Sequence, residues 1–276
     1  MIKESLRLLI KRTGSKFLYN KVRNIYWSIR NKNLIYIIRK ILIKKNYQKN
    51  KFYLNIGGFI FLKRNWRVLE YISESYPISK YLIDYNVNLL LNQKLPLSSD
   101  QVDLIYTSHT LEHLLEDSVN YNIGEKYRIL KKNGVLRIVV PDIDILWEAC
   151  KKKDFRILNY FGKKKEQTIA EYFLSTFSIK KVNKNILEKD FENLEKLEFL
   201  IKYETKQIED LNRHDFSTHI CWFNFEKIRN ILIKNGFEDQ NIRKCSCLKS
   251  KEKEMRDSQF FDNTNPEISL FVECIK

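Results

Sequence analysis

The sequence predicts an α/β protein built on a doubly wound, mostly parallel sheet, with a helical insertion and an N-terminal helical extension. Two neighbouring apolar runs carry this prediction, Val102 to Tyr106 and Val135 to Val140, joined by a helical segment that ends at Asn133-Gly134. Strands with near-continuous apolar runs are typical of parallel sheets that are covered on both faces. The strand–helix–strand order is that of a crossover between two parallel strands.

Shorter segments on either side of this unit complete the predicted sheet. We expect strands at 52–56, 66–71 and 81–84 ahead of it, and near 237–247 and 268–275 after it. A charged stretch from about 150 to 212 has apolar residues at helical spacing and no strand-like alternation, which predicts a helical insertion. The chain is therefore expected to consist of a basic extension, 1–51, and one α/β domain, 52–276, that contains the insertion.

Positive charge is concentrated in the extension. The chain has a net charge of +16, yet residues 1–51 hold 15 Lys or Arg and one acid, while the remainder holds 35 basic and 33 acidic residues. Apolar residues recur at roughly helical spacing in the extension, which favours an amphipathic helix that lies on an anionic membrane surface. A solvated basic face packed on the domain is the alternative.

Other features of the chain favour the cytoplasm. The N-terminus lacks an apolar core followed by a small-residue cleavage site, so no signal peptide is predicted. The five cysteines contain no C-x-x-C pair, as expected of reduced thiols in a cytosolic protein. We therefore expect a cytoplasmic protein, with peripheral contact at the inner membrane face through residues 1–51.

Polar residues and glycines follow the predicted strands where a parallel sheet binds ligands, beyond the carboxyl ends of its strands. Ser108 and His109 end the first strand of the crossover. Residues 53–58, YLNIGG, run from a strand into a glycine turn that would let backbone amides approach a nucleotide-like ligand. Glu70, about one strand–helix unit later, could accept hydrogen bonds from both ribose hydroxyls. Taken alone, the two glycines are explained more simply by a tight turn, and Glu70 by a solvent-exposed strand end.

Residues 109–113 read His-Thr-Leu-Glu-His, which matches the H-x-x-E-H signature of a class of zinc peptidases. Zinc would need both histidines on one helical face and a third ligand downstream. His109 instead lies at the junction between a strand and a helix. We therefore expect no metal site, and we expect His113 to be a packed or capping histidine.

A loop rich in polar and aromatic residues follows the insertion and holds Arg213, His214, Asp215, His219 and Trp222. Such a loop could face an acceptor substrate, with His219 as a base and Trp222 as a stacking wall. A structural hydrogen bond between a histidine and Asp215 is the alternative.

Together these segments resemble the class I S-adenosylmethionine-dependent methyltransferases, in particular the small-molecule group found among bacterial surface-glycan genes. The resemblance covers about residues 52–148 and 214–276 and implies a Rossmann-like fold with S-adenosylmethionine as cofactor. Its motifs are YLNIGG (53–58), WRVLEY (66–71), LPLSSDQVDLIYTSHTLEHL (95–114), YRILKKNGVLRIVVPD (127–142), HICW (219–222) and RDSQFFDNTNPEISLFVECIK (256–276).

The resemblance also implies roles for single residues. The glycine turn would line the methionine end of the cofactor, Glu70 would hold the ribose, and Asp84 would approach the adenine. Ser108 and His109 would lie near the reacting sulfonium. The residues of the turn are Asn55, Gly57 and Gly58.

One departure from the family concerns the turn itself. Phe59 stands where the family usually has another glycine, and a large side chain disfavours a positive φ or a close approach to the cofactor. A non-catalytic binding or scaffold protein that keeps the fold is therefore a second hypothesis.

The leading hypothesis is O-methylation of a sugar or lipid-linked glycan intermediate. Methyl transfer depends chiefly on alignment of donor and acceptor, and a hydroxyl acceptor also benefits from a base, for which His109 and His219 are the candidates. The basic extension motivates a third hypothesis, an RNA-modifying enzyme. The chain lacks the Asn/Asp-Pro-Pro-aromatic turn of base-amino methylation and a basic, aromatic-rich groove outside the extension, which argues against a nucleic-acid substrate.

Overall fold

The structure, a computed structural model, describes residues 51–58, 61, 63, 65–72, 83–160, 162, 164–211 and 215–276. The basic extension, Phe59, Arg213 and His214 lie outside the described residues. The expectations for an amphipathic helix in the extension and for an effect of Phe59 on the turn therefore stay predictions.

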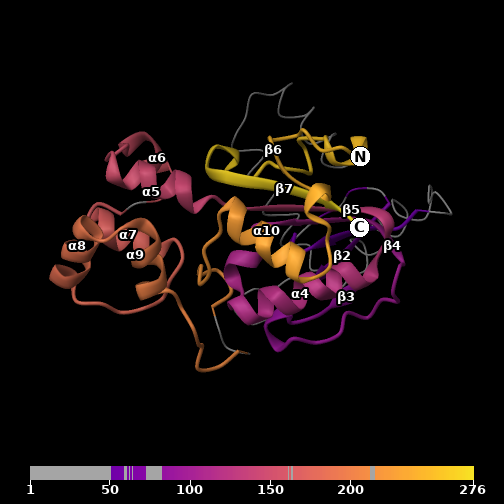
Figure 1. The fold of residues 1–276 in the computed structure, drawn as a ribbon, viewed down its shortest axis with the longest axis horizontal. Coiled ribbons are helices and arrows are strands. Elements are labelled where there is room, and N and C mark those ends of the chain that lie inside the picture. The colour runs from indigo at the N-terminus through magenta and orange to yellow at the C-terminus, as the bar shows by residue number, and fades with distance from the viewer. Residues whose placement is uncertain are drawn as a thin grey trace, which may run out of the picture.

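A seven-stranded sheet forms the centre of the domain, in the order β3-β2-β1-β4-β5-β7-β6 (Figure 1). Strands β1 to β5 are parallel to one another, whereas β7 is antiparallel to both β5 and β6. This mostly parallel sheet confirms the predicted fold class. The strands are β1 (Tyr53–Ile56), β2 (Trp66–Glu70), β3 (Tyr85–Asn86), β4 (Val102–Ser108), β5 (Leu130–Pro141), β6 (Ile242–Cys245) and β7 (Ser269–Ile275).

Both faces of the sheet are buried, which explains the continuous apolar runs. Leu54, Ile105 and Leu136 point to a core on the face covered by α4 (Glu116–Ile129) and α10 (Phe225–Lys234). Alternate residues such as Tyr53 and Tyr106 point to a second core on the other face. Each strand therefore places apolar side chains on both faces, as a covered parallel sheet requires.

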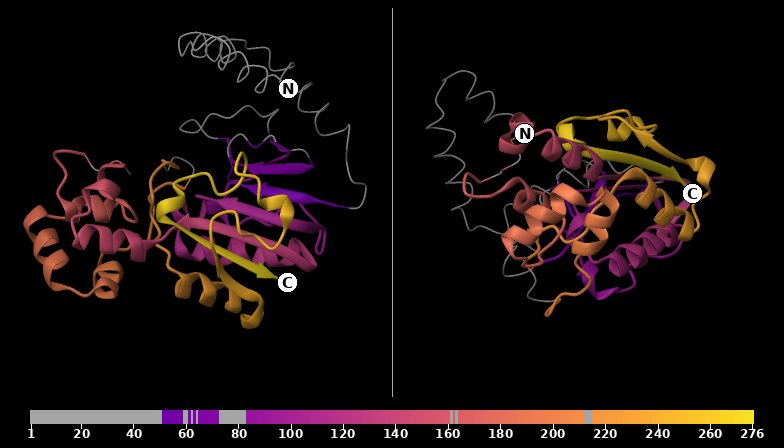
Figure 2. Two further views of the ribbon diagram at one scale, coloured as in Figure 1. Left: turned by 90° about the horizontal axis from the view of Figure 1, so that it is seen from above. Right: turned by 60° about the vertical axis from the view of Figure 1, so that its left-hand side comes forward.

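The insertion contains helices α5 (Ile143–Lys151), α6 (Phe155–Tyr160), α7 (Ile169–Ser175), α8 (Lys184–Asn193) and α9 (Lys196–Tyr203). They gather beyond one end of the sheet and form a core of their own (Figures 1 and 2). Asp142 starts α5 by accepting a hydrogen bond from the backbone N–H of Asp144, and Thr168 starts α7 with a capping box. None of the described helices is long and apolar enough to cross a bilayer.

Two predicted boundaries are corrected by the structure. The third strand is Tyr85–Asn86, and of the predicted strand 81–84 the described residues 83 and 84 lie ahead of it, where the carboxylate of Asp84 accepts a hydrogen bond from the backbone of Val68. The helix of the crossover ends at Ile129, and β5 begins at Leu130 instead of Val135. Asn133 adopts a positive φ of 64° within this early part of β5, so the Asn-Gly pair marks an irregular strand and not the helix end.

A buried charge network attaches the C-terminal segment to the sheet. Arg137 on β5 is fully buried and forms ion pairs with Asp262 and with Glu273 of β7. The segment that follows Asp262 consequently reaches the carboxyl end of β4, where Thr264 and Ser269 meet His109.

Candidate functional site

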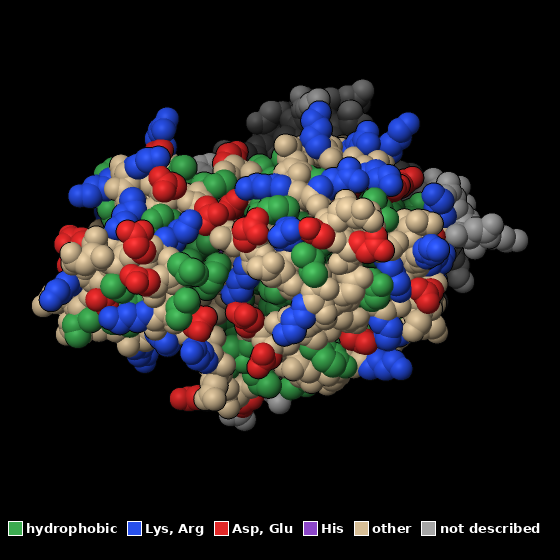
Figure 3. Space-filling view, in the orientation of Figure 1, with side chains coloured by type: hydrophobic (Ala, Val, Ile, Leu, Met, Phe, Trp, Pro, Cys, Tyr) green, Lys and Arg blue, Asp and Glu red, His purple; other side chains and the backbone are tan. Residues whose placement is uncertain are grey.

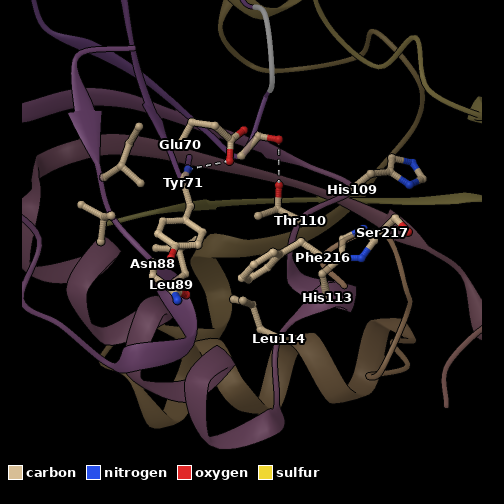
Figure 4. Close-up of a pocket in the computed structure, with 13 residues that line it drawn as sticks. Glu70, Tyr71, Asn88, Leu89, His109, Thr110, His113, Leu114, Phe216 and Ser217 are labelled. Carbon is tan, nitrogen blue, oxygen red and sulfur yellow. Dashed lines mark hydrogen bonds between the residues drawn. The ribbon is translucent and has the colours of Figure 1, made fainter. Parts of the chain in front are cut away.

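A cavity of about 310 Å³ opens beyond the carboxyl ends of β1, β2 and β4 (Figure 4). Its position is the point where the strand order reverses direction, between β1 and β4, which is where doubly wound sheets bind ligands. Its volume lies within the usual range of small-molecule sites. The lining residues are Gly57, Leu69, Glu70, Tyr71, Val87, Asn88, Leu89, His109, Thr110, His113, Leu114, Phe216 and Ser217.

The turn after β1 is possible only because residue 57 is a glycine. Gly57 has a φ of +75°, and an added Cβ would lie 2.1 Å from Oγ1 of Thr110. Thr110 donates its hydroxyl to the carbonyls of Ile56, Gly57 or Ser108, at 3.1–3.4 Å, and so holds the turn against the end of β4. The turn thus brings bare backbone to the cavity wall, as predicted.

The other two turn residues support the turn from beneath and do not line the cavity. Asn55 is fully buried, and an added Cβ on Gly58 would lie 1.7 Å from its Nδ2. The side-chain amide of Asn55 has no hydrogen-bond partner among the described residues. Gly58 is therefore needed to leave room for Asn55, which is a different reason from the one the sequence indicated.

Glu70 ends β2 and lines the cavity, at the position the sequence predicts for a ribose acceptor. One of its carboxylate oxygens accepts a hydrogen bond of 2.9 Å from the backbone N–H of Tyr71 (Figure 4). This bond orients the carboxylate at the cavity wall.

Asp84 and Ser108 do not line the cavity. The carboxylate of Asp84 accepts a 2.8 Å hydrogen bond from the backbone N–H of Val68, at the start of β3 and away from its carboxyl end. The cavity is bordered instead by the segment after β3, which contains Val87, Asn88 and Leu89. Ser108 contributes its carbonyl oxygen as an acceptor for Thr110.

His109 lines the cavity with both ring nitrogens engaged. Its Nε2 lies 3.1 Å from the carbonyl oxygen of Thr264 and 3.0 Å from Oγ of Ser269, and its Nδ1 lies 3.1 Å from Oε1 of Glu112. Burial disfavours the charged ring, but the hydrogen bond and charge of Glu112 outweigh it, so the pKa of His109 lies above its ordinary value. The ring is therefore held as a donor to Glu112.

Glu112 is the centre of a group of three histidines. Its side chain is 1% exposed, and burial would raise its pKa, but the hydrogen bond and charge of His109 lower the pKa of Glu112 to about 2. The ring of His113 meets the ring of His219 edge to face, with centroids 4.8 Å apart. Nε2 of His219 lies 4.0 Å from Oε1 of Glu112.

Hydrogen bonds determine the tautomers of these two histidines. Nδ1 of His113 lies 2.9 Å from the carbonyl oxygen of Thr218, and Nδ1 of His219 lies 3.1 Å from that of Thr176. A carbonyl oxygen only accepts, so both Nδ1 atoms carry the proton. Burial lowers the pKa of His219, which keeps its ring neutral and its Nε2 a lone-pair acceptor.

Trp222 is not a stacking wall. It is 9% exposed, belongs to the core of the insertion and lies under Nζ of Lys227, 4.0 Å from the ring centroid. The aromatic wall is formed by Tyr71 and Phe216, whose ring centroids are 5.2 Å apart. Asp215 accepts hydrogen bonds from the backbone and side chain of Ser217.

The sequence did not single out several of the residues that form the site. Tyr71 and Phe216 adjoin motifs that were recognised, but nothing in their spacing indicated that they would meet across 145 positions. Thr110 and Glu112 lie within the H-x-x-E-H motif, where the polar pattern was a usable signal.

Residues 67–138 match the family model described as a methyltransferase domain. A search of curated proteins found no match. The match covers β2 to β5, which carry Glu70, His109 and Glu112, and it lies within a doubly wound sheet. This segment of the chain is therefore similar to a methyltransferase domain, as the motifs predicted. The resemblance of the motifs implies S-adenosylmethionine as the methyl donor.

Several solved structures are similar in outline. An S-adenosylmethionine-dependent methyltransferase from Archaeoglobus fulgidus is 12% identical, with 89% of this chain and 95% of that chain covered and a TM-score of 0.39. One from Mesorhizobium loti is 11% identical, with coverages of 82% and 90% and a TM-score of 0.38. A phosphoethanolamine N-methyltransferase from Haemonchus contortus, in complex with S-adenosyl-L-methionine, is 11% identical, with coverages of 88% and 52% and a TM-score of 0.38. Scores this low carry no weight for function.

The described residues fit such a donor. Gly57 provides a wall without a Cβ, and Glu70 provides a carboxylate at the end of β2. Leu69, Val87 and Leu89 give the same side of the cavity an apolar surface suited to a purine. The opposite side carries His109 and His113, so the two ends of the cavity differ in chemistry.

Proposed function

We propose that this chain is an S-adenosylmethionine-dependent O-methyltransferase that acts on a hydroxyl group of a sugar or lipid-linked glycan intermediate. One observation carries the proposal. The cavity at the strand-order reversal has Gly57 and Glu70 on one side and a group of proton acceptors, Glu112, His113 and His219, beside the other.

When bound, the cofactor supplies a methyl group on a positively charged sulfonium. The residues of the chain then have to align the acceptor oxygen with that group, which is the main requirement of an in-line displacement. His113 lines the cavity, and its free Nε2 can accept a hydrogen bond from an acceptor hydroxyl and orient its oxygen. His219 is not among the lining residues and lies behind His113, with ring centroids 4.8 Å apart. His109 acts through Glu112, because both of its ring nitrogens already have partners, and so is a positioning residue.

The choice of a glycan acceptor rests on the sequence resemblance to the surface-glycan group. The acceptor side of the cavity supports a polar substrate, since His113 and Ser217 line it. The insertion also borders this side, because the carbonyl of Thr176, directly after α7, holds His219. An insertion at this position can contribute to the choice of acceptor.

Calorimetric titration with S-adenosylhomocysteine tests the cofactor half of the proposal. Glu70→Gln should weaken binding by about 1–3 kcal/mol, because it removes the charged acceptor for the ribose hydroxyls. Asp84→Asn is the matched control, since its carboxylate serves the neighbouring strand and lies outside the cavity, and its affinity should equal that of the unsubstituted chain. Folded protein that does not bind the ligand would contradict the proposal.

Methyl transfer from labelled S-adenosylmethionine tests the acceptor half. Sugar nucleotides and lipid-linked glycans should be labelled at oxygen, as mass spectrometry of the product can show. Labelling of RNA in place of these acceptors would favour the nucleic-acid hypothesis.

A further inference from the structure

We propose that Glu112, His113 and His219 form a binding site for one divalent transition-metal cation of the zinc type, beside the acceptor side of the cavity. The three side chains come from two distant parts of the chain, η2 (Leu111–His113) and the segment after the insertion. One ligand atom from each lies within 4.8 Å of the other two. The binding of a cation is argued from the three side chains alone, and only the role of the bound cation rests on the proposed function.

The protonation pattern is the main argument for a cation. Nδ1–H of His113 and of His219 is donated to a main-chain carbonyl, which leaves Nε2 of each ring without a hydrogen. Nε2 of His219 lies 4.0 Å from Oε1 of Glu112, and a ring nitrogen of His113 lies within 4.8 Å of the ligand atoms of both. Both oxygens of Glu112 are buried, and apart from Nδ1 of His109, 3.1 Å from Oε1, they have no hydrogen-bond donor among the described residues. Three electron-pair donors therefore converge with no hydrogen between them, and a positive charge placed there would satisfy all three.

The surroundings are those of a metal site. Histidines that bind metals usually donate their other ring N–H to a carbonyl or carboxylate, which holds the ring in place. Glu112 is oriented in turn by Nδ1 of His109, 3.1 Å away, in the way that ligating carboxylates are held by an outer residue. Two histidines and one carboxylate are a set that binds zinc or ferrous iron and leaves further positions open.

Only a small adjustment is needed for coordination. Bonds from zinc to nitrogen or oxygen are about 2.0–2.2 Å long, so the three ligand atoms must lie within about 4 Å of one another. The largest present separation is 4.8 Å at most. His219 is partly exposed and His113 lines the cavity, so rotation of either ring can close the difference.

The open coordination positions would face the cavity through His113. A cation there would bind the oxygen of an acceptor hydroxyl and increase its acidity. It would thus replace the hydrogen bond to Nε2 of His113 as the contact that orients this oxygen. The ligand set differs from the zinc-peptidase pattern that residues 109–113 suggest, because His109 is an outer residue and His219 supplies the third ligand. The proposed site departs from the expectation of no metal site, which considered only the histidines of the H-x-x-E-H motif.

Cobalt and zinc binding to the full chain test the inference. The tag-free chain is treated with a chelator and titrated with Co²⁺, followed by visible absorption, and then with Zn²⁺ by calorimetry. We expect one ion per chain, with absorption bands of a nitrogen- and oxygen-ligated cobalt. His113→Ala and His219→Ala should each weaken binding at least about tenfold. The double variant Cys245→Ser, Cys247→Ser is the control for adventitious thiol binding and should bind as tightly as the unsubstituted chain.

The site would be overturned if the folded, unsubstituted chain bound neither ion, or if binding were unchanged in both histidine variants. The cobalt spectrum of the unsubstituted chain is decisive even if a variant fails to fold, because thiolate bands in place of nitrogen and oxygen ligation would also reject it. Titration of the same samples with S-adenosylhomocysteine separates this inference from the proposed function. Chain that binds this ligand but no metal rejects only the site, and chain that binds metal but not the ligand rejects only the function.

Discussion

At the residue scale, the site depends on two positions with left-handed backbone at neighbouring strand ends. Gly57 after β1 has a φ of +75°, and His109 after β4 has a φ of +49°. A side chain in this region costs about 1–3 kcal/mol, and such strain is concentrated at functional sites. His109 tolerates it because its backbone N–H bonds to Val139 and its ring is fixed by Thr264, Ser269 and Glu112.

Gly57→Ala should weaken binding of S-adenosylhomocysteine at least about tenfold, because the new Cβ would collide with Thr110 and displace the turn. Calorimetry of the purified variant measures this loss. Gly162→Ala is the control for backbone strain alone, since Gly162 has a φ of +93° and nothing within 4 Å of an added Cβ. Equal affinities in the two variants would mean that the turn does not contact the cofactor.

Lys126 on α4 predicts a pH effect on stability. The side chain is fully buried, its ammonium has no hydrogen-bond partner among the described residues, and burial lowers the pKa of Lys126 to about 7. The unfolded chain, with a lysine pKa near about 10.4, binds more protons between these values. The free energy of unfolding should therefore rise as the pH increases from 7 toward 10.

Lys126→Met should remove this rise and stabilise the chain by about 1–3 kcal/mol at pH 7, because the buried unpaired charge is gone. Urea denaturation at several pH values provides the measurement. Lys132→Met is the comparison, since that lysine is exposed and the change should leave the profile as it is. A variant that is less stable at pH 7 would show that Lys126 has a partner that matters.

At the element scale, the insertion is a helical unit with its own aromatic core. Trp147 of α5, Phe173 of α7, Phe191 of α8 and Phe199 of α9 contact one another, with centroid distances of 5.0–5.9 Å. The core joins the sheet through residues such as Trp222 and Ile268. The unit can therefore lose stability locally while the sheet remains folded.

Phe199→Ala should destabilise the insertion by about 3–5 kcal/mol, because the side chain is fully buried and its removal leaves a cavity. Hydrogen exchange should accelerate over 155–203, whereas binding of S-adenosylhomocysteine should change by less than about twofold, since Phe199 does not line the cavity. Leu197→Ala on the same helix is the control, as Leu197 is 55% exposed. Uniform acceleration across the sheet would argue against a separate unit.

At the scale of the whole molecule, charge divides the chain into two parts. Acidic and basic side chains are interspersed over the visible face of the domain (Figure 3), in keeping with 35 basic and 33 acidic residues after position 51. The excess of positive charge lies in residues 1–51. An acceptor carried on a lipid would be reached more readily by a chain held at an anionic membrane through this extension.

The full chain should co-sediment with vesicles that contain anionic lipid, and not with neutral vesicles, and the binding should weaken as salt increases. The chain from residue 52 onward should lose this binding while it still binds S-adenosylhomocysteine. Steeply salt-dependent binding to RNA that is lost with the same truncation, without binding to vesicles, would indicate a nucleic-acid partner in place of a membrane.

Local patterns were sufficient for much of the fold. The apolar runs of β4 and β5 predicted a covered parallel sheet, and the glycine turn and Glu70 were placed at its carboxyl edge because strand ends meet there. Boundaries were less accurate where one contact shifted them. Asp84 bonds to Val68 ahead of β3, and Asn133 has a positive φ inside β5. Neither feature can be predicted from the neighbouring residues in the sequence.

The sequence by itself determined the sheet, the helical insertion and the cofactor side of the cavity, because periodicity and turn residues act over short distances along the chain. Only the tertiary structure decided the acceptor side. His219 reaches Glu112 and His113 across more than 100 positions, and the carbonyls of Thr176 and Thr218 determine which ring nitrogens remain free. Whether these residues are packed histidines or a site for a cation depends on those long-range hydrogen bonds, which no local pattern encodes.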